Sequence, residues 1–197
     1  MEIEKNIDPI KLFNEWFEQA KEKEIRDPNA MLLATVSKEG MPSLRTVLLK
    51  DIINNSFIFF TNYESKKAKD ILETGKGAIC FYWKSLNRQV RLVGNIKKIS
   101  SEISDSYFST RSRESKIGAW ASKQSTPLDS RDTLIKKVQE FEVNFKTSIP
   151  RPNFWGGFAL IPNEFEFWQD GDFRLHDRFV LKPVKNSILW ESTRLYP

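Results

Sequence analysis

The chain of 197 residues is long enough for one sizeable domain with its own hydrophobic core. Its aromatic content of 13%, with 15 Phe and 6 Trp, favours a core that is rich in β-structure. The single cysteine, Cys80, excludes an intrachain disulfide, and one His with one Cys cannot supply the usual ligands of a zinc site. The net charge of +5 suggests an anionic ligand, which leaves nucleic acid, a phosphorylated metabolite and an acidic partner open.

The first nine residues, MEIEKNIDP, lack the apolar stretch of a signal peptide. No apolar run along the chain approaches the length that spans a membrane. A single cysteine also fits a reducing compartment. We therefore expect a cytoplasmic protein that makes no contact with a membrane.

The first predicted element is an N-terminal helix at about residues 9–23. Asp8 is suited to cap it and Pro9 to its first turn. Its apolar face consists of Ile10, Leu12, Phe13, Trp16, Phe17 and Ala20. Strands are then predicted at 31–36, 43–49 and 57–61, a short helix at 64–73 with charged residues on its outer side, and a pair of strands at 78–83 and 89–99.

The second half of the chain begins with a helix that Ser100 or Ser101 caps and that runs to about Thr110. Residues 111–125 look irregular except for 117–120, and a longer helix runs from about 130 to 145. Further strands are predicted at 157–161, 164–169, 173–181 and 187–191. Short strands with a few helices between them, and no regular alternation, predict a mainly β (α+β) single domain, which is an antiparallel β-barrel of six or seven strands with peripheral helices.

The segment Glu164–Phe179 contains the only histidine, His176. A turn signal at 169–172 predicts a hairpin whose return strand carries this histidine. Because alternate residues of a strand share one face, Arg174, His176 and Arg178 would point the same way. Two guanidiniums and an imidazole make a poor core face, but they suit the wall of an anion site. The alternative is the solvated face of an edge strand.

Two further groups of residues suit phosphate. Thr61, Ser65, Lys66 and Lys67 lie where a predicted strand leads into the first turn of a helix, and free N–H groups and the helix dipole favour anions there. A solvated lysine face is an equal alternative. Arg45 and Lys50 stand at the ends of another strand, and they would leave opposite faces of it unless the strand end re-aims one of them.

Tyr107, Arg111 and Ser115 are spaced four residues apart and would share one helical face if the helix continued that far. A phenol, a guanidinium and a hydroxyl suit phosphate oxygens. Gln124 and Ser125 add an amide and a hydroxyl from a polar loop. No pair of carboxylates stands out for acid–base chemistry, and the chain has no Gly-rich nucleotide motif. The residues by themselves predict a β-barrel that binds two phosphorylated ligands, and they do not name them.

Short motifs along the whole chain resemble the pyridoxine/pyridoxamine 5′-phosphate oxidase family. They cover about Asp8 to Pro197 in the family's order, and the chain ends in R-L-Y-P. The motifs are R-T-V-L-L-K (45–50), F-F-T-N (59–62), S-K-K-A (65–68), R-Q-V (88–90), Y-F-x-x-R-x-R-x-S (107–115), I-G-A-W-A-S-K-Q-S (117–125), F-W-G-G-F (154–158), E-F-W-Q (166–169) and R-L-H-D-R-F (174–179).

The resemblance implies an FMN-binding split β-barrel that forms a homodimer, with FMN at the subunit interface and dimerisation and active-site strands at about 154–197. It implies FMN-dependent oxidation of pyridoxamine or pyridoxine 5′-phosphate to pyridoxal 5′-phosphate. A hydride would pass from the substrate C4′ to the flavin N5, and O2 would be reduced to H2O2. The reaction belongs to the biosynthesis and salvage of vitamin B6.

The resemblance also implies roles for individual residues. FMN would contact Arg45, Thr46, Val47, Leu48, Lys50, Phe60, Thr61, Lys66, Lys67, Gln89, Gln124, Ser125, Trp168 and Arg178. The substrate would contact Lys50, Tyr107, Arg111, Ser115, Arg174, Leu175 and His176. Of these, Arg174 and His176 would be the catalytic residues that cover the pyridine ring.

The sequence departs from the family's pattern at Lys66, where Arg is frequent, and at Phe60, where Tyr is frequent. The N-terminus is short compared with relatives in which this segment folds over the substrate. Two functions of other classes compete with the oxidase. One is a split-barrel flavin reductase or flavin carrier. The other is a nucleic-acid-binding barrel, which is disfavoured because the cations form separate clusters with no continuous stripe.

Overall fold

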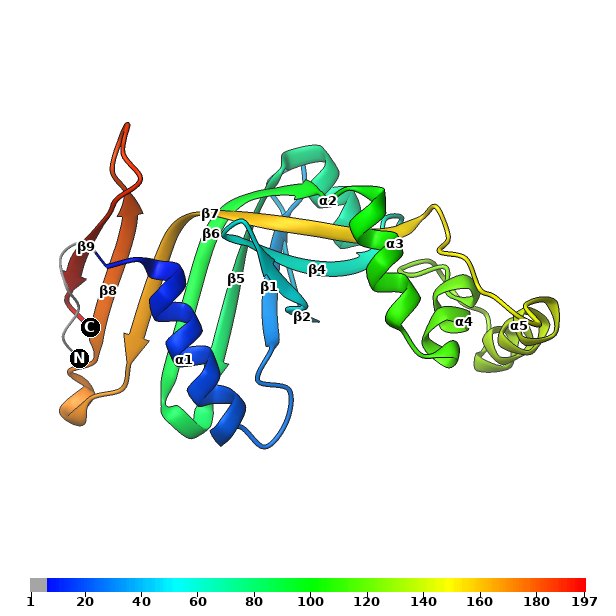
Figure 1. Ribbon diagram of the computed structural model, residues 1–197, viewed down its shortest axis with the longest axis horizontal. Helices are drawn as coiled ribbons and strands as arrows, with labels where there is room; N and C mark the ends of the chain where they lie inside the picture. Colours follow the sequence, from blue (N-terminus) through cyan, green and yellow to red (C-terminus); the bar gives the residue numbers. More distant parts are fainter. Residues whose placement is uncertain (1–6) are drawn as a thin grey trace.

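The computed structural model describes residues 7–197, which form an antiparallel sheet with one helix across its face and others at its end (Figure 1). The strands are β1 (Ala30–Val36), β2 (Pro42–Leu48), β3 (Asp51–Ile53), β4 (Ser56–Asn62), β5 (Lys76–Trp83), β6 (Arg88–Lys98), β7 (Trp155–Gln169), β8 (Asp177–Pro183) and β9 (Trp190–Leu195). The helices are α1 (Pro9–Lys23), α2 (Lys66–Thr74), α3 (Ser101–Thr110), α4 (Arg113–Ala121) and α5 (Arg131–Asn144), with 3-10 turns η1 (Lys84–Leu86) and η2 (Asp172–Arg174).

The longest strand, β7, pairs with two different strands along one of its edges, so the sheet branches there. The strand order is β2-β1-β5-β6-β7-β4-β3, and β8 and β9 branch from β7. Residues 155–160 of β7 pair with β4, residues 165–169 pair with β8, and β6 follows the other edge. The register of β6 and β7 shifts at Gly94, where a Cβ atom would lie 2.1 Å from the carbonyl oxygen of Ile161, so a side chain does not fit. This architecture confirms the predicted mainly β fold with peripheral helices.

Helix α1 covers the inner face of the sheet with aromatic side chains. Asp8 accepts a hydrogen bond from the N–H of Ile10 at 2.9 Å and caps the helix, as predicted. The ring of Phe13 lies 4.9 Å from Phe57 and 5.0 Å from Phe81, and its side chain is fully buried. Truncating such a residue costs about 3–5 kcal/mol. The packing of α1 therefore holds the strands in the arrangement that places the site.

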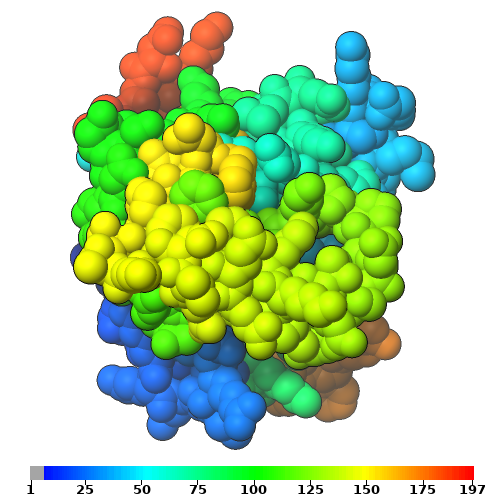
Figure 2. Space-filling model, turned by 90° about the vertical axis from the view of Figure 1, so that its right-hand side faces the viewer, coloured from blue at the N-terminus to red at the C-terminus, as the bar shows by residue number. Residues whose placement is uncertain are grey.

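Helices α3, α4 and α5 project from the end of the molecule opposite β8 and β9 (Figure 1). Each has a serine cap, formed by Ser100, Ser112 and Ser130. Helix α5 packs on α4 through Trp120, whose ring lies 5.8 Å from that of Phe141 in α5 and 5.3 Å from that of Phe145 just after it. Seen from this end, α5 and the segment that follows it lie in front of the sheet (Figure 2).

The structure corrects several predictions of local structure. Residues 111–125 are not irregular, since α4 occupies 113–121. The segments 157–161 and 164–169 are parts of one strand, and the described residues form nine strands, not six or seven. The last strand lies at Trp190–Leu195, later than the predicted 187–191.

The return strand of the hairpin begins at Asp177 and not at 173, because Phe173 and Arg174 adopt left-handed conformations with φ of 56° and 64°. The expectation of a short N-terminal segment falls on residues 1–6, outside the described part of the chain. Within residues 7–197, no helix combines the length and the apolar character needed to cross a membrane.

Candidate functional site

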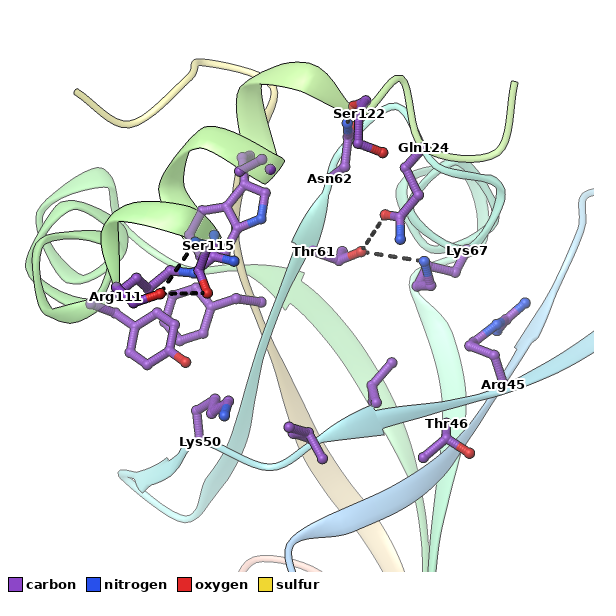
Figure 3. A pocket seen from close by; sticks show the side chains of 18 residues that line it. Arg45, Thr46, Lys50, Thr61, Asn62, Lys67, Arg111, Ser115, Ser122 and Gln124 are labelled. Atoms are coloured by element: carbon purple, nitrogen blue, oxygen red, sulfur yellow. Dashed lines mark hydrogen bonds between the residues drawn. The ribbon is translucent and has the colours of Figure 1, made fainter. Parts of the chain in front are cut away.

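A cavity of about 900 Å³ lies where β2 and β4 end against α2, α3 and α4 (Figure 3). It gathers residues from segments that are distant in the sequence. The predicted site residues that line it are Arg45, Thr46, Val47, Leu48, Lys50, Phe60, Thr61, Lys67, Tyr107, Arg111, Ser115 and Gln124. The cations among them form two groups on opposite sides of the cavity (Figure 3).

The first group lies at the N-terminus of α2. The Nζ atom of Lys67 donates to Oγ1 of Thr61 and to Oγ of Ser65, each at 3.3 Å, and Thr61 Oγ1 donates to Oε1 of Gln124 at 3.2 Å. Burial, and to a smaller degree the charge of Arg45, lower the pKa of Lys67. Ser65 makes no side-chain cap bond, so the first N–H groups of α2 remain available. These donors suit a phosphate group.

The second group comprises Lys50, Tyr107, Arg111 and Ser115. The Arg111 guanidinium lies 4.6 Å from the ring centre of Trp155, and burial lowers its pKa. Its Nη1 atom is buried without a hydrogen-bond partner among the described residues. A buried donor without a partner costs about 1–3 kcal/mol. An anionic ligand oxygen at this position would remove that cost.

Three stacked rings form one wall of the cavity. The rings of Phe60 and Tyr107 lie 3.9 Å apart and nearly parallel, at 12°. The ring of Trp155 is nearly parallel to both, and its centre lies 5.4 Å from that of Phe60 and 6.3 Å from that of Tyr107. The stack fixes the ring of Tyr107, and with it the direction of its hydroxyl group. Phe60 therefore contributes its ring plane, and the chain needs no phenol at this position to hold Tyr107.

Two sets of predicted residues line the cavity although regular strand or helix geometry would not bring their members together. They are the pair Arg45 and Lys50, and the set Tyr107, Arg111 and Ser115. Arg45 and Lys50 both line it because β2 ends at Leu48, after which the N–H of Lys50 bonds to the carbonyl of Ile58 at 2.9 Å. The strand end thus re-aims one residue. The helical face of 107, 111 and 115 is wrong as predicted, since α3 ends at Thr110 and α4 begins at Arg113. All three residues nevertheless line the same cavity.

The remaining predicted residues do not line this cavity. Ser125 follows Gln124 in the chain with a left-handed φ of 69°, and Lys66 lies beside the cavity with its ammonium 3.4 Å from Asp70 Oδ1. The others lie at the far end of β6, β7 and β8, remote from α4 in Figure 1. They are Gln89, Trp168, Arg174, Leu175, His176 and Arg178.

These distant residues form a second cluster around the β7–β8 hairpin. Gln89 pairs with Trp168, which pairs with Arg178. The ring centre of His176 lies 4.7 Å from that of Trp168, and its Nδ1 atom lies 2.9 Å from Oδ1 of Asp170.

The predicted common face of Arg174, His176 and Arg178 is wrong, because Arg174 belongs to the η2 turn. Arg178 instead donates twice to the buried Glu166, at 2.8 and 2.9 Å.

Several residues of the cavity escaped the sequence reasoning. Ser122 and Trp155 lie within the quoted motifs I-G-A-W-A-S-K-Q-S and F-W-G-G-F, so the motifs offered a signal for both. Asp70 and Lys67 contradict the expectation of a solvated outer face on the second helix, since they are 4% and 8% exposed. The side chain of Thr35 is buried as well, at 2%.

Comparison with known proteins identifies relatives of the whole chain. The family model described as "Pyridoxamine 5'-phosphate oxidase" matches residues 17–145, and "Pyridoxine 5'-phosphate oxidase C-terminal dimerisation region" matches residues 155–197. The protein named "Pyridoxine/pyridoxamine 5'-phosphate oxidase" in Brucella canis is 49% identical over 193 residues, which cover 98% of this chain and 95% of the relative.

Two solved structures share the fold. PhzG from Burkholderia lata 383, in complex with tetrahydrophenazine-1-carboxylic acid, has a TM-score of 0.90 and 30% identity, and the match covers 96% of this chain and 93% of PhzG. A pyridoxamine 5′-phosphate oxidase-related, FMN-binding protein from Nostoc punctiforme has a TM-score of 0.76 and 17% identity, over 97% of this chain and 98% of that protein.

The fold and the cation-lined cavity define a protein of the split-barrel flavoprotein class. Within that class, the chain belongs to the pyridoxamine 5′-phosphate oxidase family. It is therefore an enzyme, an oxidoreductase, and its family implies a flavin cofactor and a dimer formed through the C-terminal region.

Proposed function

We propose that the protein oxidises pyridoxamine or pyridoxine 5′-phosphate to pyridoxal 5′-phosphate, with FMN as cofactor and O2 reduced to H2O2. This reaction serves vitamin B6 biosynthesis and salvage. The single observation that carries the proposal is a pair of separate cation groups in one cavity, because FMN and the substrate each bring one phosphate. The name of the Brucella canis relative supports the same reaction. A cytoplasmic location follows from the sequence alone and stays a prediction.

The group at α2 fits the phosphate of FMN. Arg45, Lys67 and Thr61 offer charged and neutral donors, and the N-terminus of α2 adds backbone N–H groups. Gln124 would reach a polar edge of the flavin, with Ser125 and Lys66 beside it. When bound, the flavin supplies the acceptor for a hydride and passes the two electrons to O2.

The second group fits the phosphate of the substrate. Arg111 brings an unpaired buried donor, and Lys50, Tyr107 and Ser115 surround the same part of the cavity. None of the described residues that line the cavity is Asp or Glu, so an anion entering it meets no like charge on the wall. Binding both phosphates in fixed places would orient the substrate carbon toward the flavin, and orientation of this kind supplies a large part of an enzyme's rate.

We also propose that the complete site combines two copies of the chain. The hairpin cluster with Arg174, His176 and Arg178 lies at the opposite end of the molecule from the cavity (Figure 1), so one chain does not bring the two together. A two-fold dimer would place the hairpin of one copy at the cavity of the other. There, Arg174 and His176 would cover the substrate, while Gln89, Trp168 and Arg178 would contact FMN.

The outer face of the sheet supports this dimer. Leu32, Leu44, Tyr82 and Val93 are 40%, 62%, 56% and 42% exposed on four neighbouring strands. The strand register places them on the same face, which is opposite to the buried core. Exposed apolar side chains that gather on one face commonly mark protein–protein contacts. Strand β2 at one side of this face lines the cavity, and β6 at the other pairs with β7 in the region that the family model describes as a dimerisation region.

The absorbance spectrum of the purified protein tests the reaction. We expect an oxidised flavin spectrum that bleaches when pyridoxamine 5′-phosphate is added without oxygen, and that returns with H2O2 when air is admitted. A flavin reductase or flavin carrier would give the same starting spectrum and no bleaching by this substrate. Bleaching by tetrahydrophenazine-1-carboxylic acid alone would favour a reaction on the compound bound to PhzG, and would overturn the proposal.

Mixing two variants of low activity tests the composite site. Arg45→Ala disables the cavity and Arg174→Ala disables the hairpin, so each homodimer has two damaged sites. Their heterodimer has one site in which both parts are intact. Co-expression at equal amounts should therefore restore about a quarter of the wild-type activity, because roughly half of the dimers are mixed. If the mixture is no more active than the two variants apart, cavity and hairpin do not come from different copies.

A further inference from the structure

A buried polar group lies directly behind the Arg45 side of the cavity. Thr35 of β1 and Asp70 of α2 are 2% and 4% exposed, and neither lines the cavity. Oγ1 of Thr35 donates to Oδ2 of Asp70 at 2.7 Å. The same oxygen accepts a hydrogen bond from Nη1 of Arg45, also at 2.7 Å. The hydroxyl therefore links a buried carboxylate to a guanidinium that faces the cavity.

The direction of these bonds is fixed by their chemistry. A carboxylate only accepts, so the hydroxyl hydrogen of Thr35 points to Asp70 and a lone pair is left for Arg45. Nη1 of Arg45 also donates to the carbonyl of Leu33 at 3.0 Å, and Nη2 donates to Oγ of Ser43 at 2.5 Å. Two nitrogens of the guanidinium thus have fixed partners, and its plane is set before any ligand arrives.

The charges explain why a carboxylate stands so close to an anion site. Arg45 and Lys67 lie near each other, and the charge of Arg45 adds to burial in lowering the pKa of Lys67. Burial lowers the pKa of Arg45, and the charge of Asp70 opposes this shift. Asp70 also forms an ion pair with Lys66 at 3.4 Å. Without Asp70, the positive charges of Arg45, Lys66 and Lys67 would have no negative charge among them in the flavin-free protein.

We propose that Thr35 and Asp70 are positioning residues for the FMN phosphate: Asp70 fixes the Thr35 hydroxyl, and this hydroxyl holds the Arg45 guanidinium in its binding orientation. The inference rests on the proposed function, because it concerns the phosphate of the proposed cofactor. Neither residue touches the ligand site. Both act through Arg45, and Asp70 also balances the charge of the cation group.

Variants of Thr35 test the positioning role through flavin binding. Thr35→Val keeps the size and removes the hydroxyl, and we expect its affinity for FMN to fall about tenfold, in line with losing one hydrogen bond to a charged group. Riboflavin, which has no phosphate, should bind Thr35→Val and wild type equally. Fluorescence titration of the flavin-free protein with FMN and with riboflavin measures both. Thr35→Ser keeps the hydroxyl and should bind FMN with nearly wild-type affinity.

Two further comparisons distinguish a positioning role of Thr35 from a general loss of stability. If Thr35→Val does not fold, Thr35→Cys is compared with Thr35→Ser, since a thiol both donates and accepts hydrogen bonds more weakly than a hydroxyl, and the same fall is expected for Cys. In an Arg45→Ala background, Thr35→Val should cause no further loss, because the residue acts through Arg45. Thr133→Val, which removes a hydroxyl bonded to Ser130 at the start of α5, is the control and should leave FMN binding unchanged.

Asp70→Asn tests the charge balance. It keeps the size and removes the negative charge, so the flavin-free variant should melt at a lower temperature than wild type, and FMN should narrow the difference by supplying an anion. Glu73→Gln on the exposed side of the same helix is the control.

Equal FMN binding by wild type and Thr35→Val, or an unchanged melting temperature of flavin-free Asp70→Asn, overturns the inference alone. A wild-type protein that does not bind FMN overturns the proposed function together with it.

Discussion

The cavity and the β7–β8 hairpin hold their functional side chains in opposite ways. In the cavity, Arg45 and Lys67 are hydrogen-bonded to buried neighbours before a ligand is present. In the hairpin, Phe173 and Leu175 are 94% and 70% exposed, and Arg174 sits in a left-handed turn without a strand partner. The cavity is therefore a preformed anion site within one chain. The hairpin is an exposed surface, as the proposed contact with a second copy requires.

The largest expected effect comes from the preformed region. Arg45→Ala should weaken FMN binding about 100-fold or more, because it removes a charged donor that is held in place and leaves the Thr35 hydroxyl without the donor it accepts from. The flavin retained after dialysis and the dissociation constant measure the effect. The exposed Arg26→Ala serves as the control. Full flavin retention in Arg45→Ala would contradict the placement of the FMN phosphate.

A smaller effect, and one on a different quantity, is expected from the hairpin. Arg174→Ala and His176→Ala should lower kcat/KM about 10–100-fold while FMN stays bound, because these residues would orient the substrate and not the cofactor. Steady-state kinetics together with the flavin-to-protein ratio separate the two quantities. Lys185→Ala in the exposed turn between β8 and β9 is the control. An Arg174→Ala variant with unchanged kinetics would contradict the proposed role of the hairpin in orienting the substrate.

The sequence predicted the cavity better than the hairpin, and the reason is physical. Tyr107, Arg111 and Ser115 are neighbours in the chain, so even a wrong assumption of one continuous helix kept them together. The hairpin depended on strand alternation, which two left-handed residues interrupt. Phe173 and Arg174 are not residue types that favour this conformation, so composition offers no warning of it. Residues that are close in the chain stay close in space even when the predicted secondary structure is wrong. Residues predicted to share a strand face do so only if the strand is regular.

The buried support of Arg45 lay beyond what the sequence could predict. Thr35 and Asp70 are 35 residues apart and meet only when α2 packs against β1. In the sequence, Asp70 belongs to a run of lysine and acidic residues that suggests a solvated helix face. The mainly β fold, by contrast, followed from aromatic content and short strand signals that do not depend on such pairings.

The pH dependence of FMN binding should report the buried ammonium of Lys67. Burial and the charge of Arg45 lower its pKa in the free protein, and a bound phosphate would raise it again. Binding then takes up a proton between the two values, so FMN affinity falls as pH rises from the lowered pKa toward that of the complex. Fluorescence titrations from neutral to alkaline pH measure this fall. Lys67→Arg, which stays charged, should flatten the profile. If the affinity for riboflavin, which has no phosphate, fell equally steeply with pH, the interaction of Lys67 with the phosphate would not be its cause.

The smallest effect is expected at Lys66, which stands beside the cavity with a side chain that is 59% exposed and an ion pair to Asp70 at 3.4 Å. Lys66→Arg keeps the charge and adds a planar fork, but exposed ion pairs contribute only about 0–1 kcal/mol, so FMN affinity should change by less than about fivefold. Lys66→Gln should weaken FMN binding far less than Lys67→Gln, although the two residues are neighbours. A loss of equal size at both positions would show that burial does not decide which cations of this site bind the phosphate.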